Sequence, residues 1–182
     1  MTVKVSFSLK KEFEDILEEY GRDVLVVRRD KRLYCSCFNE VTQEASRTCG
    51  LCLGLGWTYI AERHRTRAED EADPAQLVRL MAIKGIGDVI AGDRKYYFKP
   101  NMHASEKDLI VEVTWDKFGR PTYNEDGGIY SISAVDRNQN LGSGKDIYKI
   151  YYAAETPVRS KIRGIRINEV LGKKQYTILM EG

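Results

Sequence analysis

The four cysteines of the chain are the residues whose type and spacing point most directly to chemistry. They fall within 18 consecutive positions, and the other residues of the 182-residue chain include no cysteine. A Cys-x-Cys pair and a Cys-x-x-Cys pair are separated by 11 residues, so two short turns can each present two thiolates. Four thiolates can surround one Zn²⁺ tetrahedrally, with bonds of about 2.3 Å. The sequence therefore predicts a structural Zn²⁺ site whose ligands are Cys35, Cys37, Cys49 and Cys52.

The glycines around the second pair fit this interpretation. Gly50, Gly54 and Gly56 let the backbone fold tightly and direct amide hydrogens toward sulfur. The stretch CGLCLGLG, residues 49–56, resembles the Cys-x-x-Cys-x-Gly-x-Gly repeat of J-domain chaperones, which implies a zinc knuckle. A metal-free or redox-active thiol cluster and an iron–sulfur centre stay open as alternatives. A catalytic zinc is not expected, because four cysteines leave no coordination position for water or substrate.

The compartment expected from the sequence also favours a metal over disulfides. The amino terminus lacks an apolar run followed by a small-residue cleavage site, and no stretch approaches the roughly 18 to 20 apolar residues of a membrane span. We therefore expect a cytosolic protein without membrane contact, where disulfides are disfavoured. A net charge of only +2 gives no global field that would attract nucleic acid or an anionic membrane.

The remaining polar residues do not predict an enzyme or a small-molecule substrate. His64 and His103 are the only histidines, and we expect both at the surface. Asp108 and Glu112 fall at the ends of a strand pattern, where carboxylates are usually solvated. The Gly pair in Lys84–Gly87 indicates a turn, because no helix pattern follows that would form a phosphate loop.

Nucleic-acid binding is the main alternative function. Basic residues surround the cysteines in sequence, and Tyr34, Trp57 and Tyr59 lie among them, a mixture suited to phosphate contacts and base stacking. Acidic residues interrupt the basic ones, which favours a solvated strand pair instead. The basic residues are Arg28, Arg29, Lys31, Arg32, Arg47, Arg63, Arg65 and Arg67.

The elements that must position the cysteines begin with a predicted helix, Leu9–Tyr20. Ser8 can cap its start, its apolar residues share one face, and Gly21 can end it in the left-handed conformation. The β-branched run 23–28 predicts a strand that enters the cysteine loop, and residues 57–60 predict the returning strand. Residues 61–73 have no apolar face, so we expect an exposed strand end and linker. This divides the chain into a helix and zinc-knuckle module, residues 1–73, and a β-barrel domain, residues 74–182.

The second part of the chain consists of short β-type runs separated by turn residues. Hairpin turns are predicted at residues 91–93, 125–128 and 137–145. Consecutive strands of this kind indicate a small antiparallel β-barrel or sandwich, so the predicted fold class is mainly β, α+β, with an N-terminal helix and a four-cysteine zinc loop. The run 146–152 has aromatic residues at positions that look exposed. Either a partner covers them in a homo-oligomer, or both faces of the strand are buried within the chain.

The order of these elements is similar to that of the neck proteins of tailed bacteriophages, the head-completion or head-closure "stopper" proteins beneath the portal. The likeness covers residues 22–153 and includes the segments AGDRKYYFKP, KDLIVEV, GGIYSISAV and KDIYKIYYA. It implies a structural virion protein at the capsid vertex, assembled in the host cytoplasm. The implied partners are further copies in a ring, the portal or adaptor protein, the tail terminator or tail-tube protein, and packaged DNA. The resemblance brings no catalytic residues and assigns no task to the zinc loop.

Overall fold

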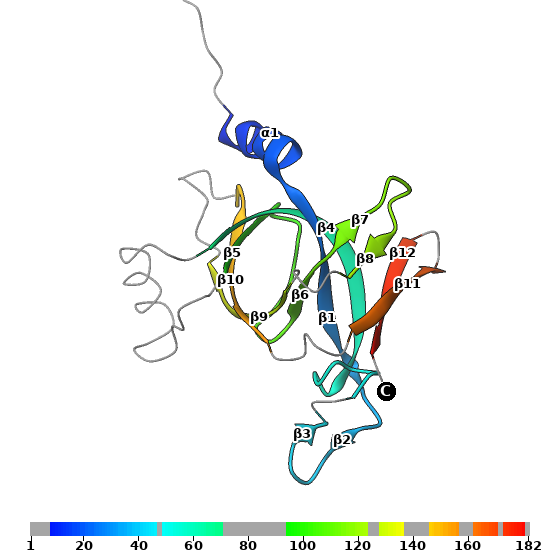
Figure 1. Cartoon of the computed structure of the whole chain (residues 1–182). Coiled ribbons are helices and arrows are strands. Elements are labelled where there is room, and N and C mark those ends of the chain that lie inside the picture. The colour runs from blue at the N-terminus through cyan, green and yellow to red at the C-terminus, as the bar shows by residue number, and fades with distance from the viewer. Residues whose placement is uncertain are drawn as a thin grey trace, which may run out of the picture.

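The computed structural model describes residues 8–46, 49–70, 94–123, 128–136, 146–156, 162–170 and 173–180. Within these ranges the chain is mainly β, with one helix, as the sequence predicts (Figure 1). No described helix has the length and apolar character needed to cross a membrane. The elements are α1 (Leu9–Tyr20), β1 (Arg22–Tyr34), β2 (Phe38–Asn39), β3 (Glu44–Ala45), β4 (Trp57–Asp70), β5 (Arg94–Phe98), β6 (Leu109–Glu112), β7 (Thr114–Trp115), β8 (Pro121–Thr122), β9 (Ile129–Asp136), β10 (Lys149–Glu155), β11 (Ile162–Val170) and β12 (Lys173–Met180).

Helix α1 has the predicted bounds, but it ends by a different mechanism. Gly21 has φ −77°, so the predicted left-handed cap is wrong. A Cβ atom at this position would lie 2.2 Å from the Leu17 carbonyl oxygen, so glycine is required by the close approach of the backbone. The same oxygen accepts hydrogen bonds from Gly21 N, at 3.0 Å, and from Arg65 Nε, at 2.6 Å. A side chain of β4 therefore caps the carboxyl end of the helix.

Six antiparallel strands close into a β-barrel, which resolves the choice between barrel and sandwich. The order is β1-β6-β9-β10-β5-β4, and β1 pairs with β4 to complete the circle. Val24 lies opposite Glu112 of β6 on one side and His64 of β4 on the other. The hairpin of β11 and β12 continues the sheet outside the barrel and is joined to it at the pair Tyr176 and Ala61.

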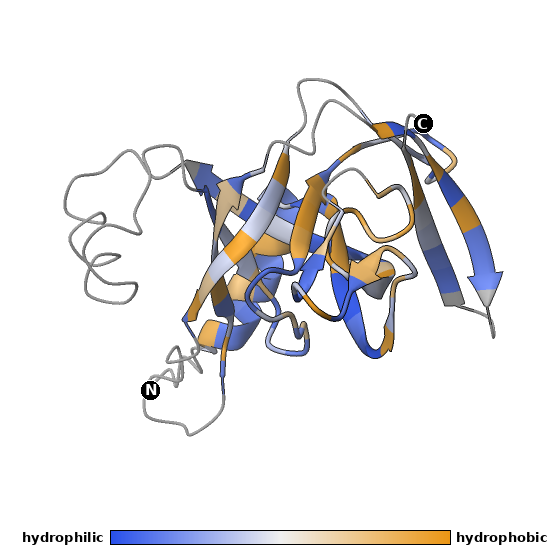
Figure 2. Cartoon of the chain, turned by 90° about the horizontal axis from the view of Figure 1, so that it is seen from below, coloured by the Kyte–Doolittle hydropathy of each residue, from blue (hydrophilic) through white to orange (hydrophobic). Residues whose placement is uncertain are grey.

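The alternation of side chains along β1 creates two separate cores. Val24 and Val26 point into the barrel, where Phe98 and Tyr151 meet edge to face with ring centroids 5.5 Å apart. Hydrophobic and hydrophilic residues alternate along the barrel strands in Figure 2. Each fully buried aliphatic or aromatic side chain contributes about 1.5 to 3 kcal/mol of transfer free energy. The inner core contains Val24, Val26, Tyr96, Phe98, Met102, Ala104, Ile110, Tyr130, Ile132, Tyr151 and Ala153.

The outer core lies between the barrel wall and the β11–β12 hairpin. Leu25 and Val27 of β1 pack there with Tyr176 and Ile178 of β12. The Tyr59 hydroxyl accepts a hydrogen bond from Ile178 N at 2.9 Å and so attaches β12 to β4 where the two strands are not paired. Burial raises the pKa of Tyr59, which keeps this hydroxyl neutral.

The expectation of a linker after residue 60 is wrong, because β4 continues to Asp70. Its residues 66–70 pair with β5, and Thr66 is fully buried. The charged residues of this segment obscure the strand pattern in the sequence. Arg63, for example, has a partly exposed side chain that pairs with Asp23 of β1 at 2.6 Å. Since β1 and β4 supply two of the six barrel strands, the sheet crosses the division predicted at residues 73 and 74.

The β10 run that looks exposed in the sequence is buried on both faces. Tyr151 lies in the inner core, whereas Ile150 and Tyr152 form a small cluster with Ala134 on the outside of the barrel. The strand therefore needs no partner to cover these side chains. The turns predicted at residues 91–93 and 137–145, most of the turn at 125–128 and the runs between residues 76 and 90 lie outside the described residues.

Candidate metal centre

The cysteines lie on a loop module, residues 35–56, that connects the far ends of β1 and β4 (Figure 1). The register of the two strands shifts after Asp30, and Tyr34 then faces Trp57. Their rings stack with centroids 3.9 Å apart, and Phe38 stacks on the other side of Tyr34 at 4.5 Å. Cys35 N donates a hydrogen bond to Gly56 O at 2.9 Å, which joins the two ends of the module. The aromatic stack therefore forms the base from which the cysteines project.

A short hairpin separates the two cysteine pairs. Strands β2 and β3 pair through Phe38 with Ala45 and Asn39 with Glu44. The Asn39 side chain accepts hydrogen bonds from Val41 N and Thr42 N, at 2.9 and 3.2 Å, and so closes the turn. The hairpin brings the Cys-x-Cys turn back toward the Cys-x-x-Cys turn across the loop.

The four thiols meet at one point, as predicted. All four Sγ atoms lie within 4.8 Å of one another. Cys35 Sγ is 3.7 Å from Cys49 Sγ, and Cys37 Sγ is 3.4 Å from Cys52 Sγ. Bonds of about 2.3 Å in a tetrahedral site place sulfurs about 3.8 Å apart, whereas a disulfide needs about 2.05 Å. The spacing therefore fits four ligands around one metal ion, and all four thiols are free.

Backbone N–H groups point toward the sulfurs, as expected for thiolates that bind a metal. Burial opposes ionisation of Cys49, but hydrogen bonds from the Leu51 N–H, the Cys37 thiol, the Cys52 N–H and the Cys35 thiol together outweigh it and lower the pKa of the Cys49 thiol to about 7. Burial raises the pKa of Cys52 to about 12, even though the Gly56 N–H favours its thiolate. Four neighbouring thiols cannot all ionise without a compensating cation, which a divalent metal supplies when bound.

Leu53 and Gly56 fix the module to the barrel. Leu53 is nearly fully buried in the outer core although it adopts φ +56°. This conformation is unfavourable for a residue with a branched side chain, so burial must compensate for its cost. Gly56 has φ +77°, and a Cβ atom there would lie 3.0 Å from the Phe38 ring. The sequence indicated the glycine, but it gave no signal for the role of Leu53.

The basic residues that suggested nucleic-acid binding are mostly neutralised within the chain. Arg29 pairs with Asp108 at 3.1 Å, and Arg32 pairs with Asp30 at 2.7 Å. Arg47 lies outside the described residues. The other basic residues with an acidic partner are Arg28 with Glu62, Arg63 and Arg65 with Asp23, and Arg67 with Glu69.

Three residues expected at the surface lie elsewhere. Asp108 and Glu112 are buried and ion-paired, so the interpretation as solvated carboxylates is wrong. His64 is half-buried, with its ring edge-on to Phe98 of the inner core, whereas His103 is exposed as predicted. The sequence could have indicated Glu112, because a carboxylate that interrupts the apolar run LIVEV needs a buried cation.

A scan against protein-family models finds no match for the chain, and a search of curated proteins finds none. The fold and the four-thiol site therefore carry the functional argument.

Proposed function

We propose that the protein is a structural component of the neck of a tailed bacteriophage, where a ring of copies beneath the portal or adaptor closes the DNA channel and offers a surface to the tail. The similarity in the order of elements suggests this role. The observation that carries the proposal is the closed barrel whose strands β1 and β4 extend into a projecting module. A stiff body with a projecting contact element suits a subunit of a ring.

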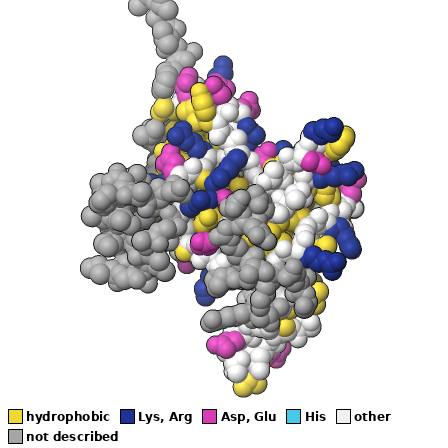
Figure 3. All heavy atoms as spheres, in the orientation of Figure 1, with side chains coloured by type: hydrophobic (Ala, Val, Ile, Leu, Met, Phe, Trp, Pro, Cys, Tyr) yellow, Lys and Arg dark blue, Asp and Glu magenta, His cyan; other side chains and the backbone are white. Residues whose placement is uncertain are grey.

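The proposed task of the module is to contact a neighbouring protein, either another copy or the adjoining portal, adaptor or tail protein. Val41 at the hairpin tip is 92% exposed, and Leu51 in the second cysteine turn is 71% exposed. Hydrophobic side chains are visible at the end of the module in Figure 3. Leu33 and Tyr34 at its base are also exposed. Apolar groups collected on a projection are typical of protein contact sites.

We propose Zn²⁺ as the ion held by Cys35, Cys37, Cys49 and Cys52. Four sulfur ligands with tetrahedral spacing suit Zn²⁺, and a closed shell suits a structural role. The ion would hold the module in one shape, so that its apolar side chains are presented in a fixed arrangement. Metal analysis of the purified protein tests this directly: one zinc per chain is expected, and iron with a visible absorption band would indicate a cluster instead.

The function is tested by producing phage particles without this protein. Electron microscopy should then show filled heads that lose DNA or fail to join tails, whereas normal tailed particles would refute the proposal. Complementation with variants tests the module. Val41→Asp and Leu51→Asp should block the joining of heads and tails, while Phe118→Asp, at an exposed apolar residue of the β7–β8 turn, should restore it.

The purified protein also allows a test of the nucleic-acid alternative. DNA binding that weakens steeply as salt rises would favour that function, because it reports the release of counterions from phosphates. We expect weak binding, since most of the basic residues around the module already have acidic partners.

A further inference from the structure

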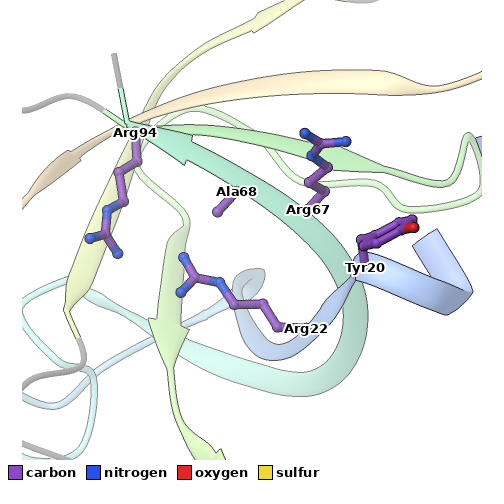
Figure 4. Close-up of a pocket in the computed structure, with 5 residues that line it drawn as sticks. All are labelled: Tyr20, Arg22, Arg67, Ala68 and Arg94. Atoms are coloured by element: carbon purple, nitrogen blue, oxygen red, sulfur yellow. The ribbon is translucent and has the colours of Figure 1, made fainter. Parts of the chain in front are cut away.

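Helix α1 exposes an apolar stripe that the barrel does not cover. Leu9, Ile16 and Tyr20 are 42%, 39% and 67% exposed, and their spacing of seven and four residues places them on one face of the helix. Tyr20 borders a hollow of about 580 Å³ at this end of the barrel, and Figure 4 shows its ring at the side of the hollow, apart from Arg94. The stripe is therefore open to solvent.

The helix is attached to the rest of the chain by the neighbouring part of its apolar face. Leu17 is buried, and the Phe13 ring stacks on Tyr148 with centroids 4.8 Å apart. Arg65 donates hydrogen bonds to the carbonyl oxygens of Leu17 and Glu18, both at 2.6 Å. These contacts fix the helix on the barrel, so the exposed stripe is held in one orientation before a partner binds.

Acidic side chains border the stripe on the side of the helix opposite to Leu17. Glu12, Asp15 and Glu19 are exposed and follow one another at spacings of three and four residues. Among the described residues, none of the three has an ion-pair partner. Figure 3 shows acidic and hydrophobic side chains together on α1. A surface that binds this helix must therefore offer cations beside groups that pack on an apolar stripe.

The β11–β12 hairpin offers such a surface on the side that faces away from the outer core. Ile165 and Ile167 pack on the outer core, so Arg166 between them points to the opposite face. Arg163, at the bulge of β11, is exposed as well. Neither arginine has an acidic partner within the described part of the chain. The aliphatic stem of an arginine covers apolar surface, and its guanidinium stacks on aromatic rings such as that of Tyr20.

The charges of the two surfaces belong to whole segments and do not depend on single pairs. Residues 8–20 contain five acidic and two basic residues, whereas residues 157–182 contain six basic and two acidic residues. The helix lies at one end of the barrel and the hairpin lies on its outside (Figure 1). One chain can therefore use both surfaces at once, each with a different neighbour.

We propose that α1 of one copy docks on the outward face of the β11–β12 hairpin of the next copy. The apolar stripe packs on the arginine stems, and Asp15 and Glu19 meet Arg163 and Arg166. Because the contact joins two different surfaces, it continues from copy to copy and can close into a ring. This inference rests on the ring proposed above, for which it supplies the interface between copies.

The test reverses the charges of one surface at a time in the full chain. A helix variant carries Asp15→Arg and Glu19→Arg, and a hairpin variant carries Arg163→Glu and Arg166→Glu. In sedimentation at low ionic strength, the parent should associate with a dissociation constant on the order of 10 to 100 μM, and each variant at least about tenfold more weakly. An equimolar mixture of the two variants should regain the affinity of the parent, because each helix then meets a hairpin of opposite charge.

Control variants carry the same kinds of change at exposed residues elsewhere. Glu106→Arg, in the loop before β6, and Lys117→Glu, in the β7–β8 turn, should associate like the parent. Ile16→Ser should weaken association at low and at high salt, because it removes an apolar contact that salt does not screen. All the substituted side chains are exposed, so each variant should keep the circular dichroism spectrum of the parent.

A mixture of the two variants that stays dissociated would overturn the proposal, because it would show that the two surfaces do not meet. A parent protein that is monomeric at about 1 mM would overturn it as well, and so would control variants that associate as weakly as the helix and hairpin variants. If a double variant does not fold, Glu19→Arg and Arg166→Glu are used singly in the same mixture. Failure here would leave the neck role to the experiment on phage particles, so the two proposals can fail separately.

Discussion

Strands β1 and β4 take part in two regions that are held together in different ways. Inside the barrel, residues 24–27 of β1 are completely buried, with one core on each side. Beyond Asp30 the same strand becomes exposed, and the module at its end shows Val41 and Leu51 to solvent. The barrel is therefore stabilised by apolar burial, whereas the module has too little buried apolar surface and depends on its thiols and on Leu53.

The largest expected effect follows removal of two of the four thiols that we propose as metal ligands. Cys49→Ser combined with Cys52→Ser should abolish metal binding, because two neutral hydroxyls replace two thiolates. The amide NMR signals of residues 35–56 should collapse or exchange, while those of β5, β9 and β10 stay in place. Zinc content measured by mass spectrometry and a two-dimensional NMR spectrum give the two readings.

Val41→Ser is the control for this prediction, because Val41 belongs to the same module but faces solvent. It should retain one metal ion per chain and the signals of the parent protein. If the double variant kept an ordered module, the module would not depend on its thiols, and the two regions would not be stabilised in different ways.

A cavity in the inner core should destabilise the whole molecule instead. Phe98→Ala removes a fully buried ring that contacts Tyr151, and we expect the free energy of unfolding to fall by about 3 to 5 kcal/mol. Urea denaturation followed by fluorescence measures the change. Phe118→Ala, at a residue that is 69% exposed, should change it by less than about 0.5 kcal/mol.

Leu53→Ala probes the junction between the two regions. The variant loses the side chain that the module inserts into the outer core, and we expect a loss of about 2 to 4 kcal/mol together with faster hydrogen exchange in the module. Leu53→Gly loses the same contacts but relieves the positive φ. It should therefore be no less stable than the alanine variant. A much less stable glycine variant would show that the backbone conformation costs nothing at this position.

The sequence predicted the parts of the fold that depend on local patterns. The bounds of α1 follow from its apolar face, and the meeting of the four thiols follows from the spacing of two pairs. The prediction from sequence failed where a residue far away in the chain changes the environment that the local pattern indicates. In the sequence, Arg63 and Arg65 give β4 the pattern of a linker, but in the structure both pair with Asp23 of the neighbouring strand. Glu112 has the pattern of a solvated carboxylate, but in the structure it is buried and pairs with two arginines. Ion pairs between distant segments leave no periodic signal.

His64 gives the smallest expected effect, and it reports on the barrel rather than the module. Burial lowers the pKa of His64, and the nearby Arg28 lowers it further, while Glu62 opposes the shift. In the unfolded chain the pKa is about 6.5, so below that pH the unfolded state binds the proton more readily than the folded state. The contribution of His64 to the free energy of unfolding is therefore fully present above pH 6.5, and it is lost as the pH drops toward the lower pKa of the folded state. The measurement is urea denaturation between pH 7.5 and 5.5. Over this range the free energy of unfolding should fall less for His64→Gln than for the parent, whereas His103→Gln should follow the parent. An equal fall for all three proteins would show that His64 does not cause the pH dependence.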